Sequence, residues 1–349
     1  MNNLRSKLGV VVIGLLILAA FVTLVTHLTN KPLSYTISQS YSPSSGFSAV
    51  APFGSDSLVY SDGQALMAYN YASGKSTALS PVVGLSGAAI DSVSVSENNQ
   101  FILFHDEQVS SNGALYRQLV GLGLSPQQDY WWLYNVAKQS FYPLPQSTLL
   151  AKMAGNDVEA LMEATSGESL TAYDTTSLTA ESTINIPGSS NFFVTNSGFL
   201  LQSPDNQILS TKNGVVSQVV ASNATMVGVL PDGRQAVVVF GQGDARQLTL
   251  LNLVNHTRQI IANDIVGEPA WSPSGTVLYT ISGTNPSSTT LYSYDLTSHK
   301  DWLWHFSGSA SWLNNSPLTP IMLAGAETAV VGNNSNDYYL IGPALKQPE

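Results

Sequence analysis

Beyond residue 30, short runs rich in Val, Leu, Ile and Tyr are separated by clusters of Gly, Asn, Pro and Ser. Apolar runs broken by turn residues in this way are typical of β-strands joined by tight connections. This part of the sequence contains no convincing amphipathic helix, whose apolar positions would recur about every 3.6 residues. The pattern therefore predicts an all-β fold.

One apolar run recurs with the same ending, a Tyr or Leu followed by Asn or Asp. The copies end at Asn70, Asn135, Asp174, Asn252 and Asp295. Their steps fit a unit of about 40 residues, the length of one four-stranded propeller blade. Degenerate copies are expected near Thr211, before the turn sequence Lys212-Asn213-Gly214, and at Tyr339. The spacing predicts a β-propeller of seven four-stranded blades, with six or eight as alternatives.

A second element precedes these runs: Ser-Pro-Ser-Gly or Pro-Asp-Gly, followed by a β-rich strand. The best copies run from Trp271 to Tyr279 and from Leu230 to Phe240, and weaker copies begin at Phe53 and Ser96. Pro-Asp-Gly and Pro-Ser-Gly favour a tight turn between two strands. These residues resemble the repeat of TolB-type propellers, also called the WD40-like β-propeller repeat. The resemblance implies a propeller with a binding role outside the inner membrane, and it carries over no catalytic residue.

The segment from Leu8 to Leu28 contains no charged residue and has about the 20 residues that a membrane-spanning helix needs. Arg5 and Lys7 precede it, which favours a cytoplasmic N-terminus. A cleaved signal peptide is the alternative, but the apolar stretch is long and no A-x-A-like site follows it. The predicted organisation is a cytoplasmic segment at 1–7, a signal-anchor helix at 8–28 and an extracellular or periplasmic propeller at 29–349.

The ring of blades must close, and the last blade lacks sequence for a fourth strand after Ile341. The segment Leu33–Gln39 alternates apolar and polar residues and has no blade of its own. We expect this segment to supply the outer strand of the last blade, because pairing would satisfy an exposed sheet edge.

The overall charge narrows the range of partners. The chain has 13 Lys plus Arg against 23 Asp plus Glu, a formal net charge of −10. Nucleic-acid binding requires a basic surface that releases counterions, so no nucleic-acid partner is expected. The chain contains no cysteine, so the folded state depends on its apolar core rather than on disulfides.

His105, Asp106 and Glu107 form the one tight cluster of titratable residues. Such residues could bind a metal or carry protons, but alternation along a strand points His105 and Asp106 to opposite faces. We therefore interpret them as a strand end, and we expect neither a metal nor a cofactor. The common signatures of hydrolases, metalloproteases and nucleotide-binding proteins are also absent from the sequence.

An insertion at about 106–129 interrupts the second repeat unit and is unusually apolar for a solvated loop. Its partner-binding candidates are Leu115, Tyr116, Leu119, Leu122 and Leu124. One interpretation is an arm, either a hairpin or a short helix, that presents an apolar face to a partner. The other is a lid packed on its own propeller.

Large aromatic residues gather in two stretches, Tyr130–Tyr134 and Trp302–Trp312. They could stack on sugars, but packing between blades is favoured because large aromatics dominate protein cores.

Together these features predict a non-enzymatic, membrane-anchored propeller that mediates protein–protein interaction in a cell-envelope, secretion or adhesion assembly. The alternative is an extracellular propeller enzyme, either glycosidase-like or quinone-cofactor dehydrogenase-like. Clustered acidic, basic or His side chains at the channel mouth would favour the enzyme, and a lining of small neutral residues would favour the binder.

Overall fold

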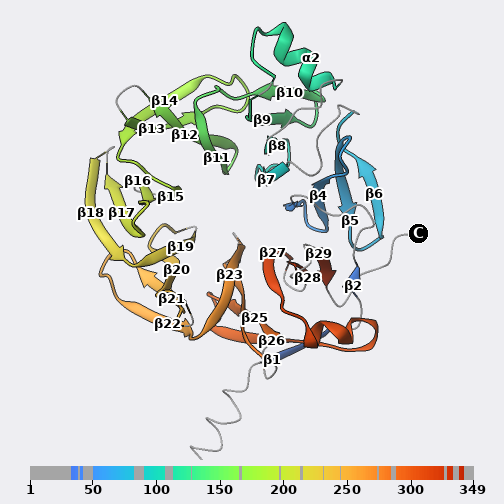
Figure 1. Ribbon diagram of the computed structural model, residues 1–349, viewed down its shortest axis with the longest axis vertical. Helices are drawn as coiled ribbons and strands as arrows, with labels where there is room; N and C mark the ends of the chain where they lie inside the picture. Colours follow the sequence, from blue (N-terminus) through green and yellow to red (C-terminus); the bar gives the residue numbers. More distant parts are fainter. Residues whose placement is uncertain are drawn as a thin grey trace, which may run out of the picture.

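The structure is a computed structural model that describes residues 33–37, 40–41, 50–81, 90–106, 113–126, 128–164, 167–195, 198–212, 215–230, 232–243, 245–272, 275–283, 288–325, 328–332 and 338–341. These residues form seven sheets arranged as blades around a common centre (Figure 1). The predicted seven-bladed, all-β propeller is confirmed.

Blades 1 to 4 follow one another along the chain, each from its innermost strand outward. Blade 1 comprises β3 (Val50–Phe53), β4 (Ser57–Ser61), β5 (Leu66–Asn70) and β6 (Lys75–Ala78). Blade 2 comprises β7 (Ile90–Val95), β8 (Phe101–Asp106), β9 (Tyr130–Asn135) and β10 (Ser140–Pro143), with helix α2 (Ala114–Gly121) between β8 and β9. Blade 3 comprises β11 (Thr148–Ala154), β12 (Asp157–Ala164), β13 (Gly167–Tyr173) and β14 (Ala180–Ile186). Blade 4 comprises β15 (Asn191–Thr195), β16 (Gly198–Gln202), β17 (Gln207–Lys212) and β18 (Val215–Ser222).

Blades 5 to 7 complete the ring, and the last two also use strands from the beginning of the chain. Blade 5 comprises β19 (Ala224–Val229), β20 (Gln235–Phe240), β21 (Gln247–Asn252) and β22 (Arg258–Ala262). Blade 6 comprises β23 (Ile265–Ser272), β24 (Thr276–Ser282), β25 (Thr289–Asp295), β26 (Lys300–Phe306) and β1 (Leu33–Ile37). Blade 7 follows the 3-10 helix η1 (Gly308–Asn315) and comprises β27 (Thr319–Gly325), β28 (Thr328–Gly332), β29 (Tyr338–Ile341) and β2 (Ser40–Tyr41).

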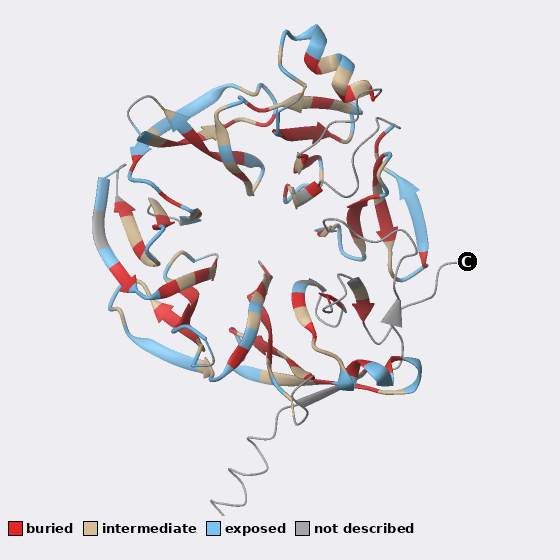
Figure 2. Ribbon diagram, in the orientation of Figure 1, coloured by how far each residue is buried: buried red, intermediate tan, exposed pale blue. Residues whose placement is uncertain are grey.

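The core lies in the seams between blades, because alternate residues of each strand point to opposite neighbours. In β12, Val158 and Ala160 pack with residues of blade 2, whereas Leu161 packs with Phe192 and Leu201 of blade 4. Burying a large apolar side chain stabilises a fold by roughly 1.5–3 kcal/mol. Figure 2 shows the consequence: buried residues gather on the middle strands, while the outermost strands are largely exposed.

The recurring Asn or Asp ends the third strand of a blade and stabilises the following turn. Asn252 Oδ1 accepts hydrogen bonds from the backbone N–H groups of Val254 (2.9 Å) and Asn255 (3.1 Å). A side-chain oxygen that accepts a bond from two or three residues ahead forms an Asx turn. Equivalent bonds are made in four other blades, by Asn70, Asn135 and Asp295 at the end of the third strand and by Asp174 directly after it. The repeat in the sequence is therefore the repeat of one local hydrogen-bonding pattern.

The expected degenerate copies are also third strands. Thr211 lies in β17 of blade 4, and Tyr339 lies in β29 of blade 7. The Pro-Asp-Gly and Ser-Pro-Ser-Gly elements lie between the first and second strands, as predicted. Gly233 and Gly275 adopt positive φ angles there, at 66° and 89°.

Strands β1 and β2 pair with two different blades, whereas the sequence predicted pairing with the last blade alone. Strand β1 does not enter the last blade; it lies parallel to β26 as the fifth strand of blade 6, with Leu33 opposite Trp302. The fourth strand of blade 7 is β2, which pairs antiparallel with β29 through Ser40 and Tyr41. An alternating pattern identifies a strand but not the edge it pairs with, and β26 offers a longer edge than β29.

The predicted membrane span Leu8–Leu28 lies outside the described residues. Within the described ranges, no helix is long and apolar enough to cross a membrane.

Candidate binding face

The two faces of the disc carry different kinds of connection. Each blade is an antiparallel meander, so the links between strands 1 and 2 and between strands 3 and 4 lie on one face. We call it the turn face. The links between strands 2 and 3, and those from one blade to the next, lie on the other face, which we call the connection face. Helix α2, between β8 and β9, and η1, between β26 and β27, belong to the connection face by this topology.

Three exposed apolar side chains lie near the connection-face ends of innermost strands. Leu149, Val266 and Ile321 lie within the first three residues of the innermost strands β11, β23 and β27. Each of these strands starts at the connection face, and the three side chains are between 37% and 50% exposed. Large apolar side chains are usually buried, and we take these three positions, on blades 3, 6 and 7, as the candidate binding surface of the connection face.

Helix α2 explains much of the apolar character of the insertion. Leu115 and Leu119 are buried in the core cluster that includes Phe104 and Trp132, and the Gln118 Nε2 group donates a hydrogen bond to Phe141 O (2.7 Å). Tyr116 and Leu124 are partly buried against the same cluster. Leu122 is exposed beside Val120. The helix therefore packs on its own propeller and presents only its tip, and whether that tip binds a partner stays a prediction.

The His105–Glu107 cluster is divided by the structure. His105 stacks on Trp131, with ring centroids 5.0 Å apart, while Asp106 is fully buried. Glu107 lies outside the described residues. Among the residues that the structure describes, no three His, Cys, Asp or Glu side chains are grouped so that they could hold a metal ion.

The aromatic stretch at Tyr130–Tyr134 packs between blades as predicted. Tyr130, Trp131, Trp132 and Tyr134 are all buried. In the second stretch, Trp304 is buried and its Nε1 group donates to Ser293 Oγ (3.0 Å). Trp312 is exposed on η1, with its ring 4.8 Å from that of Tyr339.

Three ionisable residues lie on the described innermost strands: Asp91, Lys152 and Glu268. The Lys152 ammonium turns into the seam with blade 4, where it donates to Asn191 Oδ1 and Phe192 O and lies 4.1 Å from the centre of the Phe193 ring. Burial lowers the pKa of Lys152 to about 8, because desolvation disfavours its charged form. The Phe193 ring and the two oxygen acceptors offset part of that cost.

Glu159 lies directly opposite Lys152 in the pairing of β12 with β11. Its Oε2 atom is buried and has no hydrogen-bond partner. Burial raises the pKa of Glu159 to about 7, and the nearby carboxylates of Asp157 and Glu181 add to the effect. No salt bridge joins Glu159 to Lys152.

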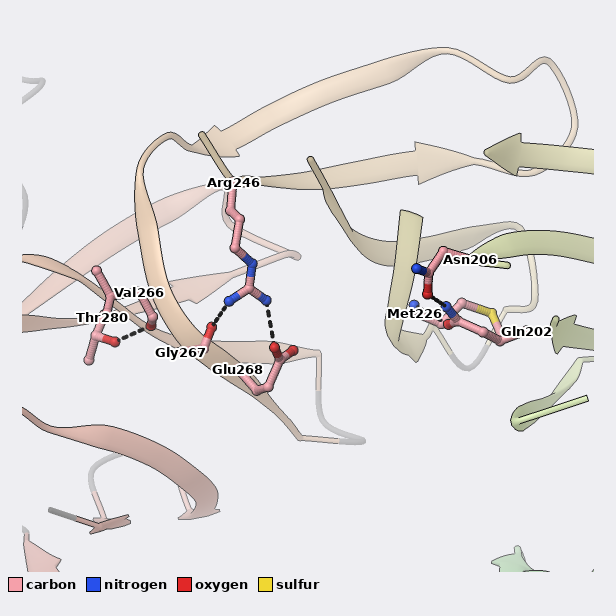
Figure 3. Close-up of polar contacts among 8 residues, drawn as sticks. All are labelled: Gln202, Asn206, Met226, Arg246, Val266, Gly267, Glu268 and Thr280. Carbon is pink, nitrogen blue, oxygen red and sulfur yellow. Dashed lines mark hydrogen bonds and ion pairs between the residues drawn. The ribbon is translucent and has the colours of Figure 1, made fainter. Parts of the chain in front are cut away.

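A small cavity opens on the connection face at the seam between blades 5 and 6. It has a volume of about 160 Å³ and is bordered by Arg246 from the β20–β21 connection, Asp264 from the β22–β23 connection and Ser282 from the end of β24. The Arg246 guanidinium donates to Gly267 O and to Glu268 Oε1, both at 2.7 Å (Figure 3). Neither Arg246 nor Asp264 was singled out by the sequence, because they belong to neighbouring blades and match no motif. The only local signal is the pair Gly241 and Gly243 in the connection before Arg246.

No family model matches the sequence, and no curated protein matches it. Solved structures are similar in fold. The β-propeller domain of the trilobed protease from Pyrococcus furiosus, described as having an open velcro topology, has a TM-score of 0.54 and 11% identity over 85% of this chain and 95% of that one. Acylaminoacyl peptidase from Pyrococcus horikoshii has a TM-score of 0.52 and 11% identity over 82% of this chain and 49% of that one.

TolB from Acinetobacter baumannii is also among the similar structures, with a TM-score of 0.37 and 12% identity over 76% of this chain and 53% of that one. The chain thus spans about half the length of the peptidase and of TolB. At these identities the likeness concerns the fold alone. The class that fold and topology define is a seven-bladed β-propeller.

Proposed function

We propose that this protein is a membrane-tethered, extracytoplasmic propeller that binds another protein of a cell-envelope, secretion or adhesion assembly through its connection face. The observation that carries the proposal is the exposure of Leu149, Val266 and Ile321 at the connection-face ends of three innermost strands. Central apolar anchors surrounded by polar rims provide most of the energy of protein–protein interfaces.

The polar groups near the channel support binding over catalysis. Lys152 and Glu268 are the ionisable residues of the innermost strands whose side chains the structure describes. The Lys152 ammonium is held in a seam by Asn191 and Phe192, and the Glu268 carboxylate is paired with Arg246. Catalysis by general acids and bases needs titratable groups that converge on one substrate position. These two groups make contacts within the protein instead.

The direction of β1 supports a particular orientation of the disc. Strand β26 runs from the turn face to the connection face, and β1 lies parallel to it, so Leu33 is the end of β1 nearer the turn face. Four residues separate Leu33 from the predicted span Leu8–Leu28, a reach of about 14 Å at most. We infer that the turn face is directed toward the membrane and that the connection face is open to a partner.

Site-specific photo-crosslinking in the native membrane tests the proposal. A photoreactive amino acid at Leu149 or Ile321 should give a defined adduct with the same partner. Val254 is the matched control position, because it is 74% exposed and lies between β21 and β22 on the turn face. Adducts that form at Val254 but not at Leu149 or Ile321 would contradict the assignment of the binding face.

The orientation has its own test. Protease added to intact cells or spheroplasts should degrade the propeller if it lies outside the plasma membrane. Protection until the cells are lysed would place the propeller on the cytoplasmic side.

A further inference from the structure

The cavity between blades 5 and 6 combines opposite charges in a small space. Among the described residues that border it, Arg246 is the one cationic residue and Asp264 the one anionic residue, and Ser282 and Val266 lie beside them. A volume of about 160 Å³ is too small for a nucleotide or a similar cofactor, whose sites usually reach several hundred Å³. It suits a ligand of only a few heavy atoms.

The Arg246 guanidinium has N–H donors that its hydrogen bonds within the protein do not use. Its side chain is 17% exposed, and its two hydrogen bonds to the protein use two of the five N–H donors of a guanidinium. Its ion-pair partner Glu268 is 68% exposed and does not border the cavity. Solvent screens an ion pair of this kind, so much of the positive potential of Arg246 remains available to a ligand.

Asp264 supplies the complementary charge. Its carboxylate has no hydrogen-bond or ion-pair partner among the described residues, and its backbone φ is 54°. Gly243 and Gly267, which also border the cavity, have positive φ angles of 62° and 69° and place no side chain in it. A ligand can therefore approach the backbone closely on these two sides.

We propose that this cavity binds a small zwitterion of the α-amino acid class, such as glycine or alanine. The ligand carboxylate accepts hydrogen bonds from the unused N–H groups of Arg246, and its ammonium donates to Asp264, with Ser282 as a further polar contact. A simple anion would meet repulsion from Asp264, and a simple cation would meet repulsion from Arg246. A zwitterion satisfies both groups, and a short side chain would contact Val266. This site shares Val266 with the proposed docking surface, but its charged residues, Arg246 and Asp264, are not part of that surface.

Saturation-transfer difference NMR on the whole chain with L-alanine tests this site. A ligand of so few atoms binds weakly, so the titration should extend to about 20 mM. L-alanine and glycine should give saturable signals. Acetate and N-acetylalanine lack the ammonium, and alaninamide lacks the carboxylate. Each should bind at least about tenfold more weakly than L-alanine, because one charged hydrogen-bonded contact is lost.

Variants locate the site. Arg246→Gln and Asp264→Asn should each weaken L-alanine binding at least about tenfold. Asp264→Asn keeps the side-chain shape at an exposed position, so it remains informative if Arg246→Gln unfolds the blade. The matched controls are Arg234→Gln, on the turn face of the same blade, and Asp129→Asn, in the connection before β9 of blade 2; both should bind as the wild type does.

Three results would overturn the proposal. They are the absence of a saturable signal in the wild type, equal binding of acetate and L-alanine, and unchanged binding in Asp264→Asn. Replacing Leu149 and Ile321 with Ser removes two of the three apolar anchors of the proposed docking surface. The third anchor, Val266, borders the cavity and is left unchanged, so the cavity keeps all its described lining residues. That variant should retain L-alanine binding, so failure of the docking proposal and failure of this one give different results.

Discussion

The turn face and the connection face are built from the same strands but by different chemistry. On the turn face, short links are fixed by local hydrogen bonds, as at Asn252 and Asp295, and the side chains serve the backbone. On the connection face, a longer link carries helix α2, two links border a cavity, and three innermost strands begin with exposed apolar residues. The difference indicates that one face maintains the repeat, while the other is free to vary and to acquire a binding role.

The largest loss of folding stability is expected for Leu119→Ala in α2. Leu119 is fully buried in the seam of blades 1 and 2, so its truncation should lower the free energy of unfolding by about 3 kcal/mol. Leu122→Ala, three residues further at the exposed tip, should change it by less than about 0.5 kcal/mol. Denaturant unfolding of both variants measures the difference. Equal losses would show that the tip is also part of the core.

Alanine substitutions at two glycines compare how tightly the chain is packed near the two faces. A Cβ at Gly228, near the turn-face end of β19, would lie 2.4 Å from the Trp271 ring of blade 6. Gly228→Ala should therefore cost about 1–3 kcal/mol. A Cβ at Gly121 in α2 would meet no atom within 4 Å, so Gly121→Ala should be neutral or stabilising by up to about 1 kcal/mol. A neutral Gly228→Ala, measured by thermal unfolding, would show that the seam can relax.

Glu159 is an exception to the well-satisfied polar groups near the turn face. Because its pKa is raised to about 7, the folded protein binds more protons than the unfolded chain between about pH 4.5 and 7. Its contribution to stability is present below pH 4.5 and is lost as the pH rises through 7. Glu159→Gln should therefore match the wild type at low pH and be more stable at pH 8, by roughly 1 kcal/mol after allowance for solvent screening.

The measurement is the difference in melting temperature between Glu159→Gln and the wild type as a function of pH. Taking the difference cancels groups that titrate equally in both proteins. A difference that does not change between pH 4 and pH 8 would show that Glu159 titrates normally.

The last comparison of stability between the two faces removes one Asx turn. Asn252→Ala leaves the N–H groups of Val254 and Asn255 without their side-chain acceptor, and it should cost about 1 kcal/mol. The exposed position allows water to replace part of the interaction. Unfolding of this variant beside Asn263→Ala, which removes a bond from Gln247 on the connection face, compares the two faces directly. A larger loss for Asn263→Ala would reverse the expected order.

The sequence alone was sufficient to predict the features of the fold that depend on interactions within a few residues. The Asn and Asp residues that end third strands, and Gly233 and Gly275 in the tight turns, act within a few residues of themselves, so their spacing predicted the blades. The pairing of strands that are far apart in the sequence could not be predicted in this way. Nothing local distinguishes the edge of β26 from that of β29, and β1 was assigned to the wrong blade.

The candidate sites show the same limit. Five apolar residues of the insertion were predicted together, but only the fold separates buried Leu115 and Leu119 from exposed Leu122. Arg246 and Asp264 meet because two blades are adjacent, and no sequence pattern links them.

Strands β1 and β2 pair with blades 6 and 7, respectively, and this has a consequence for how the ring responds to mechanical force. The strand that completes blade 7, β2, has only two residues, whereas β1 pairs with β26 over five positions, and the Ser307 N–H group donates to Ile37 O at the end of β1. A force applied through the residues before Leu33 reaches β1 first. When it acts along the strand, it loads the β1–β26 hydrogen bonds together in shear instead of opening them one by one. Tension on the proposed membrane tether would therefore act on blade 6 before it reached β2, the short strand that completes blade 7.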